Sequence, residues 1–580
     1  MGYKFKSCRG HHCFSGLGRR SAGAFFDRIM AAEIRKSGPG DAGKWITLVK
    51  ETLGEEHPAK QVYEEEWAAR ELDDASGHET WVAEVDGKIT AAGSILFFSP
   101  KPDSDDTGNT SRVSRDYSFL KNPVCNVGRN LMLPTAAEDG SGEALIIKLS
   151  ELATEREQMA IARVLASDNE QQIVFEKAGF VCVGFQPDKH FHTIREEVLF
   201  YVKPARSIIG NRVALSESLP MINELATAAM ANLQIPISGT AHDGGQGYPL
   251  QTDVTFLGVN SDRYEEEREK VRSQNPPLEM SGGFNTGHGF MRVDVEMPAD
   301  AFIVEREGEV VGGMHFIFDE LDRCVRVLNA FCTDGLSAGA MMHHLLKVSQ
   351  AQLNAFYVEV DILGSATRLL ISAEQLGFVP TAYLPGFHKQ GDGIIDVVKM
   401  VKFNQNFVIE EAKLTSQASA IAQVVGRCLE DQAGGVAIVN LLRDLAIFSG
   451  LGDGELRKLG RLFTQKLFKP MEAIFNRDDA GSEAYVIMRG KVDIFLDETQ
   501  QPIASFEQGQ VFGELSFLDG SPRGAKAIAA QPTILLIIKR NDFYELTQRE
   551  PHLGLAVMKN IALELGNRLR QMNASLQGDT

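Results

Sequence analysis

The sequence predicts a multidomain protein: two tandem α/β domains, then a smaller, mainly β domain that ends in a long helix. Two observations predict this order. Two segments about two hundred residues apart read alike, because each has a helix followed by Gly-Phe-Val and by later strands. Near the carboxyl end, short apolar runs alternate with glycine-containing turns, which is typical of a β-roll that closes its own edges.

Composition limits the kinds of partner. The chain has 580 residues, a net charge of −19 and 43% hydrophobic residues, which is enough for several packed domains. An acidic surface repels phosphates, so we expect no nucleic acid partner and no binding to anionic membranes. No apolar run approaches the ~20 residues of a membrane span. Seven scattered cysteines, an odd number, indicate reduced thiols and a cytoplasmic location.

Residues 1–33 are expected to form an N-terminal extension. It carries four potential metal ligands within six residues, namely Cys8, His11, His12 and Cys13. A tetrahedral zinc site normally draws its ligands from two chain segments, and no second cluster follows nearby. We therefore expect an exposed, flexible peptide that holds no metal.

The first α/β domain is expected over residues 34–205. Its expected elements are helices over Trp45–Lys50 and Tyr63–Leu72, a hairpin over Glu79–Phe98, a strand ending at Pro134, a helix over Glu143–Arg156, a strand over Ile161–Ala166 and a helix over Asn169–Ala178. Asp86-Gly87 predicts the turn of the hairpin. Gly140, Ser141 and Gly142 are expected to form a glycine loop that opens the helix after it.

The second α/β domain is expected over residues 206–404 and repeats this order. Gly179 and Gly377, which follow the matching helices, are 198 residues apart. Its expected elements are a hairpin over Ala301–Phe318, a strand over Val325–Cys332, a loop and helix over Gly335–Leu353 and a strand over Phe356–Ile362. Ile237–Ser281 is expected to be a long excursion, and residues 405–440 a helical connector.

Glu359 and Asp361 alternate on one of these strands and point the same way. The pattern allows a shared acidic cleft, although a solvated strand face is the expected arrangement.

The element order of both copies resembles the GNAT acyltransferases, and the resemblance spans most of residues 34–404. In that family a glycine loop at a helix start holds the pyrophosphate of coenzyme A. The resemblance implies that Gly140, Ser141 and Gly142 bind acetyl-CoA, and that the acyl acceptor is a protein or small amine. The chain departs from the family at Glu138 and Asp139, and at Phe175 and Ala373, where the family has a tyrosine acid. No catalytic residue is assigned.

The third domain is expected over residues 441–580. Its expected elements are helices over Leu442–Phe448 and Glu455–Phe463, strands over Ala484–Met488, Lys491–Phe495 and Thr533–Ile538, and helices over Arg540–Gln548 and His552–Met572. The last helix has an apolar stripe made of Leu553, Val557, Ile561, Leu565 and Leu569. This helix is expected to be a lid over a ligand, a homodimer seam, or both.

The segment Val511–Ala525 carries an acid, Glu514, and a guanidinium, Arg523, on either side of a short turn. It resembles the phosphate-binding cassette of cyclic nucleotide-binding domains in catabolite-activator-like regulators and cyclic-nucleotide-dependent kinases. The resemblance implies that the acid binds the ribose and the arginine binds the cyclic phosphate. The residues expected to bind the nucleotide are Gly513, Glu514, Leu515, Arg523, Gly524 and Ala525. Gly524 stands where a threonine favours guanine, so cAMP is the expected ligand.

Two functions follow from these domains. The first is an allosterically regulated N-acetyltransferase, since the combination resembles bacterial cAMP-regulated protein acetyltransferases. The alternative is a non-enzymatic signalling module in which the GNAT-like domains are degenerate. The departures at the glycine loop and at the tyrosine position favour the alternative, whereas the intact order of elements favours the enzyme.

Overall fold

A computed structural model gives the fold in two compact units, one up to Val425 and one from Gly426 onward. The chain passes from the first unit to the second within helix α12 (Ser416–Arg443). The structure describes residues 32–55, 60–73, 79–97, 124–191, 195–213, 217–237, 239–241, 247–250, 252–272, 280–281, 299–390, 393–404, 413–443, 445–496 and 501–578. The N-terminal Cys/His cluster lies outside these residues.

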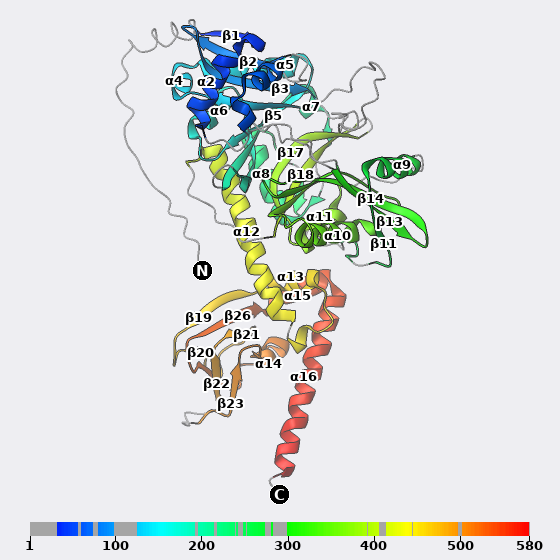
Figure 1. The fold of residues 1–580 in the computed structure, drawn as a ribbon. Helices are drawn as coiled ribbons and strands as arrows, with labels where there is room; N and C mark the ends of the chain where they lie inside the picture. The colour runs from blue at the N-terminus through cyan, green and yellow to red at the C-terminus, as the bar shows by residue number, and fades with distance from the viewer. Residues whose placement is uncertain are drawn as a thin grey trace, which may run out of the picture. The chain divides into compact units, whose positions relative to one another are not determined.

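The first unit is built on one mixed sheet, in which two lobes lie edge to edge (Figure 1). The first lobe contributes β1 (Glu33–Lys36), β2 (Glu79–Val85), β3 (Lys88–Phe97), β4 (Val124–Met132), β5 (Met159–Leu165), β6 (Val181–Phe191) and β7 (Arg195–Lys203). The second lobe contributes β11 (Thr255–Val259), β13 (Ala299–Arg306), β14 (Glu309–Asp319), β15 (Cys324–Cys332), β16 (Tyr357–Leu363), β17 (Val379–Gln390) and β18 (Gly393–Phe403).

The two lobes have the same strand order. From its outer edge, the first lobe runs β1-β2-β3-β4-β5-β7-β6, and the second runs β11-β13-β14-β15-β16-β18-β17. In each lobe one neighbouring pair is parallel, β4 with β5 and β15 with β16. The predicted hairpin turn is confirmed, because Asp86 and Gly87 both have positive φ angles of 51° and 80°.

Helices cover the sheet. The first lobe has α2 (Ala42–Leu53), α3 (Glu65–Glu71), α4 (Pro134–Asp139), α5 (Ser141–Glu155) and α6 (Asn169–Lys177), and α7 (Arg206–Gly210) follows it and packs against β17. The second lobe has α8 (Pro220–Asn232), α9 (Ser261–Arg272), α10 (Ser337–Ala351) and α11 (Thr367–Gln375). α2 and α5 both pack against β3, which explains why that strand is buried along most of its length.

Short ladders complete the first unit. They are made by β8 (Arg212–Val213) with β18, by β12 (Met280–Ser281) with β16, and by β9 (Glu217–Ser218) with β10 (Thr240–Ala241). The expected excursion over Ile237–Ser281 is therefore wrong in part, since it includes the edge strand β11 and the helix α9.

The lobes join where β6 meets β17. Gly184 on β6 lies opposite Ala382 on β17, and these two positions are 198 residues apart, so they are equivalent in the two copies. A Cβ atom on Gly184 would lie 2.9 Å from the Ala382 Cα and 3.0 Å from the Thr381 carbonyl oxygen. Only glycine allows the two strands to approach so closely.

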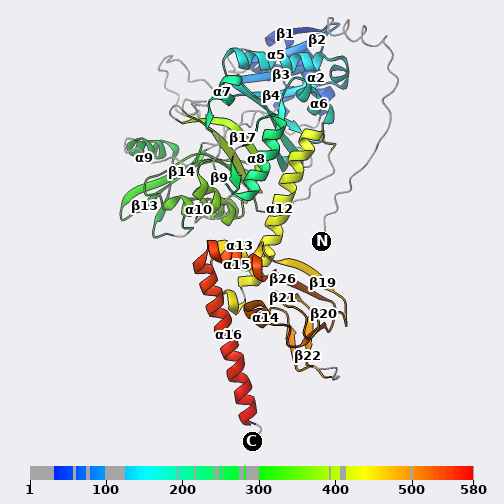
Figure 2. The ribbon, with the colours of Figure 1, turned by 180° about the vertical axis from the view of Figure 1, so that it is seen from behind.

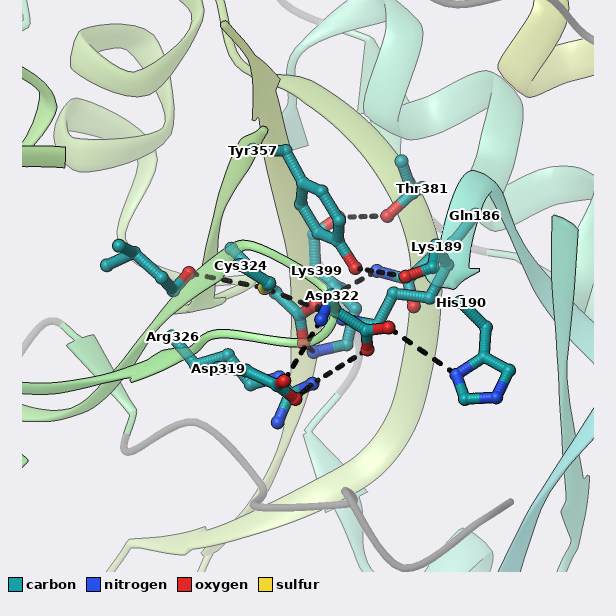
Figure 3. Close-up of polar contacts among 12 residues, drawn as sticks. Gln186, Lys189, His190, Asp319, Asp322, Cys324, Arg326, Tyr357, Thr381 and Lys399 are labelled. Atoms are coloured by element: carbon teal, nitrogen blue, oxygen red, sulfur yellow. Dashed lines mark hydrogen bonds and ion pairs between the residues drawn. The ribbon is translucent and has the colours of Figure 1, made fainter. Parts of the chain in front are cut away.

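A buried ionic cluster crosses this seam (Figure 3). The Glu359 carboxylate on β16 accepts hydrogen bonds from Lys189 of the first lobe and from Lys399 of the second, each at 2.7 Å. Lys399 also reaches Asp361 at 2.6 Å. Burial opposes ionisation of Glu359, yet the lysines hold the pKa of that carboxyl well below its usual range. Burial lowers the pKa of Lys189, whereas the neighbouring carboxylates raise that of Lys399. The ion pairs connect the two lobes through buried side chains.

The solvated strand face expected for Glu359 and Asp361 is wrong. Their exposed fractions are only 3% and 1%, and both are paired with lysine. Next to them, Arg326 reaches Asp319 at 3.1 Å and Asp322 at 3.6 Å. Removing one partner of such a pair leaves an uncompensated buried charge, which costs ~3–5 kcal/mol.

The second unit is a β-roll with helices (Figure 2). One four-stranded sheet of the described residues has β19 (Thr464–Phe468), β26 (Thr533–Lys539), β21 (Glu483–Arg489) and β24 (Val511–Phe512). The other has β20 (Ala473–Phe475), β25 (Lys526–Ala529), β22 (Lys491–Phe495) and β23 (Ala504–Glu507). The helical elements are η6 (Ala446–Phe448), α13 (Asp453–Gly460), α14 (Glu514–Asp519), α15 (Arg540–Arg549) and α16 (Pro551–Gly578).

Gly184→Val should destabilise the first unit, because the added side chain forces β6 and β17 apart. We expect a loss of ~1–3 kcal/mol, the usual cost of overpacking, and a lower melting temperature in a thermal unfolding scan. Gly258→Val is the matched control, since a Cβ atom at this strand position meets nothing within 4 Å. A Gly184→Val protein that melts with the wild type would contradict the close approach.

Candidate functional site: a cassette built around Arg523

The cassette begins at a glycine that the backbone requires. β24 ends at Phe512, Gly513 has a φ of 76°, and α14 starts at Glu514. A Cβ atom on Gly513 would lie 2.8 Å from the Arg523 Nη1 atom. Gly513 is thus needed both for its left-handed backbone and for the approach of the guanidinium.

Arg523 is the centre of the site, although only 2% of it is exposed. Nη1 donates to the Gly513 carbonyl at 3.0 Å, and Nη2 donates to the Glu483 carbonyl at 2.8 Å and to the Glu483 Oε2 atom at 3.2 Å. The buried Nε makes no hydrogen bond within the described part of the chain. Since a guanidinium has five N–H donors, this one retains donors for an anion.

Aromatic rings hold the guanidinium in place. The Arg523 Cζ atom lies 4.4 Å from the ring centroid of Phe475 and 5.4 Å from that of Tyr485. Tyr485 stacks in turn on Phe512 at 5.1 Å in the roll interior. A cation over aromatic faces is stabilised without losing its outward hydrogen bonds. Sequence reasoning missed Glu483, Phe475 and Tyr485, because their strands are distant from the cassette in sequence.

The other predicted cassette residues differ in exposure. Glu514 is partly buried at the start of α14, and Leu515 is 60% exposed. Gly524 is exposed and Ala525 is partly buried. The structure thus brings Gly513 and Arg523 into contact, and it places Gly524 and Leu515 towards solvent. The role of each in binding remains a prediction.

The back of the cassette packs on the terminal helices. Both views place α14 between the strands of the roll and α16 (Figures 1 and 2). Phe517 of α14 contacts Phe543 of α15, with ring centroids 5.5 Å apart. Arg540, the first residue of α15, donates from Nη2 to the Ser516 carbonyl at 2.6 Å. A ring contact and a hydrogen bond thus join α14 to α15.

The first part of the apolar stripe of α16 faces its own unit. Leu553, Val557 and Ile561 have exposed fractions of 0%, 2% and 7%, and they lie in one core with α13, α15 and the roll. A cavity of about 40 Å³ remains beside this core, lined mainly by apolar side chains and by Glu514 and Glu564. The homodimer through this helix remains a prediction.

The predicted glycine loop of the first lobe is largely helical. α4 ends at Asp139, Gly140 has a φ of 83°, and α5 begins at Ser141, so Ser141 and Gly142 belong to the first turn of α5. The Ser141 N–H donates to the Asp139 Oδ1 atom at 2.9 Å. A Cβ atom on Gly142 would lie 2.6 Å from the Met132 Sδ atom.

These contacts do not fit a pyrophosphate as they stand. A carboxylate already accepts from the helix start, and a methionine side chain covers the glycine. The buried Ser141 Oγ, which has no hydrogen-bond partner among the described residues, is the one feature that suits an anion. Binding of acetyl-CoA at Gly140, Ser141 and Gly142 therefore remains a prediction.

The matching helix start in the second lobe is also covered. Asp334 Oδ1 accepts from the N–H groups of Leu336 and Ser337, each at 2.8 Å. A Cβ atom on Gly339 would lie 2.8 Å from the Tyr248 carbonyl oxygen. The segment 247–250 thus lies against α10 where a phosphate would have to approach.

Two further properties concern the described residues alone. They contain no group of three or more His, Cys, Asp or Glu side chains placed to hold a metal ion. In these residues, no helix combines the length and the apolar character that a membrane span needs.

Comparison with known proteins places the cassette in a family. Residues 465–550 match the cyclic nucleotide-binding domain. A cyclic AMP receptor protein of Thermus thermophilus is 33% identical over 133 residues, which are 22% of this chain and 60% of that protein. A regulatory subunit of cAMP-dependent protein kinase from Hypocrea atroviridis is 30% identical over 107 residues, 18% of this chain and 23% of the subunit.

A solved structure is also similar, that of the Thermus thermophilus catabolite activator protein. It is 32% identical, covers 23% of this chain and 62% of its own, and superimposes with a TM-score of 0.21. This chain spans less than two thirds of each of these relatives. The family match over residues 465–550 shows that the second unit contains a cyclic nucleotide-binding domain, as the cassette predicted.

Glu483→Gln should tighten cyclic nucleotide binding. The Glu483 carboxylate pairs with Arg523 and repels a phosphate, so neutralising it favours the ligand. We expect a roughly threefold to tenfold lower Kd by isothermal titration calorimetry, up to ~1.4 kcal/mol. Glu507→Gln is the control, because that carboxylate is 71% exposed and 3.9 Å from Lys491. Unchanged or weaker binding by Glu483→Gln would refute the competition.

Proposed function

We propose that this protein is a cAMP receptor whose C-terminal domain controls a pair of GNAT-like lobes. One observation carries the proposal: the buried Arg523 guanidinium is held at the start of α14 with donors left for an anion. A cyclic phosphate is an anion of the size and charge that such a fork binds. The domain match over residues 465–550 supports the same ligand class.

cAMP is the proposed nucleotide rather than cGMP. Gly524, which follows Arg523, has no hydroxyl with which to hold a guanine amino group. Two relatives, a cyclic AMP receptor protein and a regulatory subunit of cAMP-dependent protein kinase, support the same choice by their names. The contacts between α14 and α15 provide a path by which occupancy of the cassette would move the terminal helices. Such a response requires that cAMP bind two arrangements with different affinity.

The output lobes are proposed to be GNAT-like, with boundaries near residues 34, 205 and 404. One feature that both lobes share supports this proposal. In each lobe, two neighbouring parallel strands pair at one end and separate at the other, and this separation is called the strand split. β4 and β5 pair only from Val124 to Val127, although β4 continues to Met132. β15 and β16 pair only from Cys324 to Arg326, although β15 continues to Cys332. In each lobe an irregular register with the preceding strand lies beside the split.

The first candidate role proposed for the lobes is that of a response element, which binds a partner or a metabolite. Both helix starts are already bonded to carboxylates, and both positions of the family tyrosine are apolar and buried, Phe175 and Ala373. Transfer of an acetyl group to an amine is the second candidate. The strand split favours it, because a thioester would lie between the separated strands.

Calorimetric titration of the full chain with cAMP and cGMP tests the receptor. We expect cAMP to bind, and Arg523→Lys to bind at least about tenfold more weakly, since a single ammonium cannot replace the fork. Lysine is chosen over alanine because Arg523 also bridges Gly513 and Glu483, so alanine would disturb the fold. Arg489→Lys, an exposed arginine of the same domain, is the control. Flat isotherms with both nucleotides would end the proposal.

Hydrogen exchange with acetyl-CoA tests the second candidate. If the first lobe binds the thioester, acetyl-CoA at millimolar concentration should slow amide exchange in the first turns of α5, since its N–H groups would be protected. Addition of cAMP should change that protection. No change anywhere in the two lobes would exclude acetyl transfer and leave the receptor function standing.

A further inference from the structure

We infer that the nucleotide signal is delivered to the first lobe, through the segment that starts α12. This segment, Lys413–Gln417, is called the α12 root. The inference rests on the proposed nucleotide binding and names the element of the lobes that would respond. It is drawn from hydrogen bonds inside the first unit and from the continuity of α12 along the chain.

The polar contacts of the α12 root go mainly to one helix, α6. The Asn169 side chain donates to the Lys413 carbonyl at 2.9 Å. The Thr415 N–H donates to the Gln172 Oε1 atom at 3.1 Å, and the Thr415 hydroxyl donates to Glu176. These three residues of α6 lie on successive turns, so the root lies along this helix of the first lobe.

The root also contacts the strand that follows α6. The Gln417 Oε1 atom accepts from the Cys182 N–H of β6 at 3.3 Å. From the second lobe, Asn232 at the end of α8 donates to the Gln417 carbonyl at 3.3 Å and to the Cys182 carbonyl at 2.8 Å. Both views show α8 beside the first turns of α12 (Figures 1 and 2). Asn232 thus supports the attachment of the root to β6.

A chain of hydrogen bonds leads from the root to the strand split. Gln172 is fully buried, and its Nε2 atom donates to the Ala166 carbonyl at 2.9 Å. Ala166 comes directly after Leu165, the last residue of β5. This end of β5 lies beyond Ala162, the last residue of β5 that pairs with β4. One glutamine therefore connects Thr415 to the end of the strand that borders the split.

A second set of hydrogen bonds holds the Glu176 carboxylate in place. Its Oε1 atom accepts from the Tyr201 hydroxyl at 3.1 Å as well as from Thr415. Burial raises the pKa of Tyr201, so the phenol keeps its proton and acts as the donor. The carboxylate has two partners from different elements, and a displaced root would leave it with one. Such a contact responds to small shifts because buried polar groups need their partners.

α12 is anchored again after it leaves the first unit. Its early residues Ala418, Ile421 and Val425 are fully buried in the first unit, whereas Val439 and Leu442 belong to the core of the nucleotide unit. A rearrangement of that core would act on the far end of the same helix.

Hydrogen exchange of the full chain with and without saturating cAMP tests this inference. In the wild type, cAMP should change exchange in α6 and at the end of β5 by at least about threefold, and change it less in α11. Thr415→Val and Gln172→Leu should each lose the change in α6. The change in α14 and the calorimetric Kd for cAMP should stay at wild-type values.

Two control variants test whether the effect is specific to the Thr415 hydroxyl. Thr415→Ser keeps the hydroxyl and should restore the response of α6. Thr227→Val removes an exposed hydroxyl that donates only to its own helix, to the Asn223 carbonyl, and should change nothing. A response in α11 instead of α6, or an unaltered response in both Thr415→Val and Gln172→Leu, would overturn the inference while cAMP still binds. Absence of any cAMP binding would instead refute the receptor function on which it rests.

Discussion

The Glu359 carboxylate, held between Lys189 and Lys399, is the contact on which the first unit depends. It joins the two lobes, because its lysine partners come from different lobes and all three side chains are buried. A seam of this kind cannot open and close cheaply, since each separated charge would be left buried and unpaired. In the proposed response, α6 and β5 are therefore better placed to move than the ion pairs of the seam.

The parts that sequence predicted well are those determined by neighbouring residues. The contact of Gly513 with Arg523 depends on a short turn, and the match over residues 465–550 bears out the ligand class. The parts that it missed depend on distant partners. Glu359 was expected on a solvated face, whereas Lys189 lies 170 residues away. Likewise Glu483 reaches Arg523 from a strand 40 residues earlier, which no local pattern indicates.

The two units differ in whether the hydrogen-bond donors that suit an anion are still available. At Arg523 the fold holds a cation by carbonyls and aromatic rings and leaves donors over. At the starts of α5 and α10 the fold supplies its own carboxylates, Asp139 and Asp334. Helix starts favour negative charge wherever it comes from, so an internal acid substitutes for an external phosphate. The contrast favours a chain that senses a nucleotide and responds through binding, with transfer chemistry as the second candidate.

The junction of Gly184 with Ala382 bears on the symmetry of the two lobes. Strands that meet at equivalent positions of two copies are related by a local twofold axis, the symmetry of a simple dimer. A separated lobe would therefore expose a strand edge that is complementary to the same edge of the other lobe. Because the two lobes are covalently linked, their pairing is intramolecular and does not depend on the concentration of the protein.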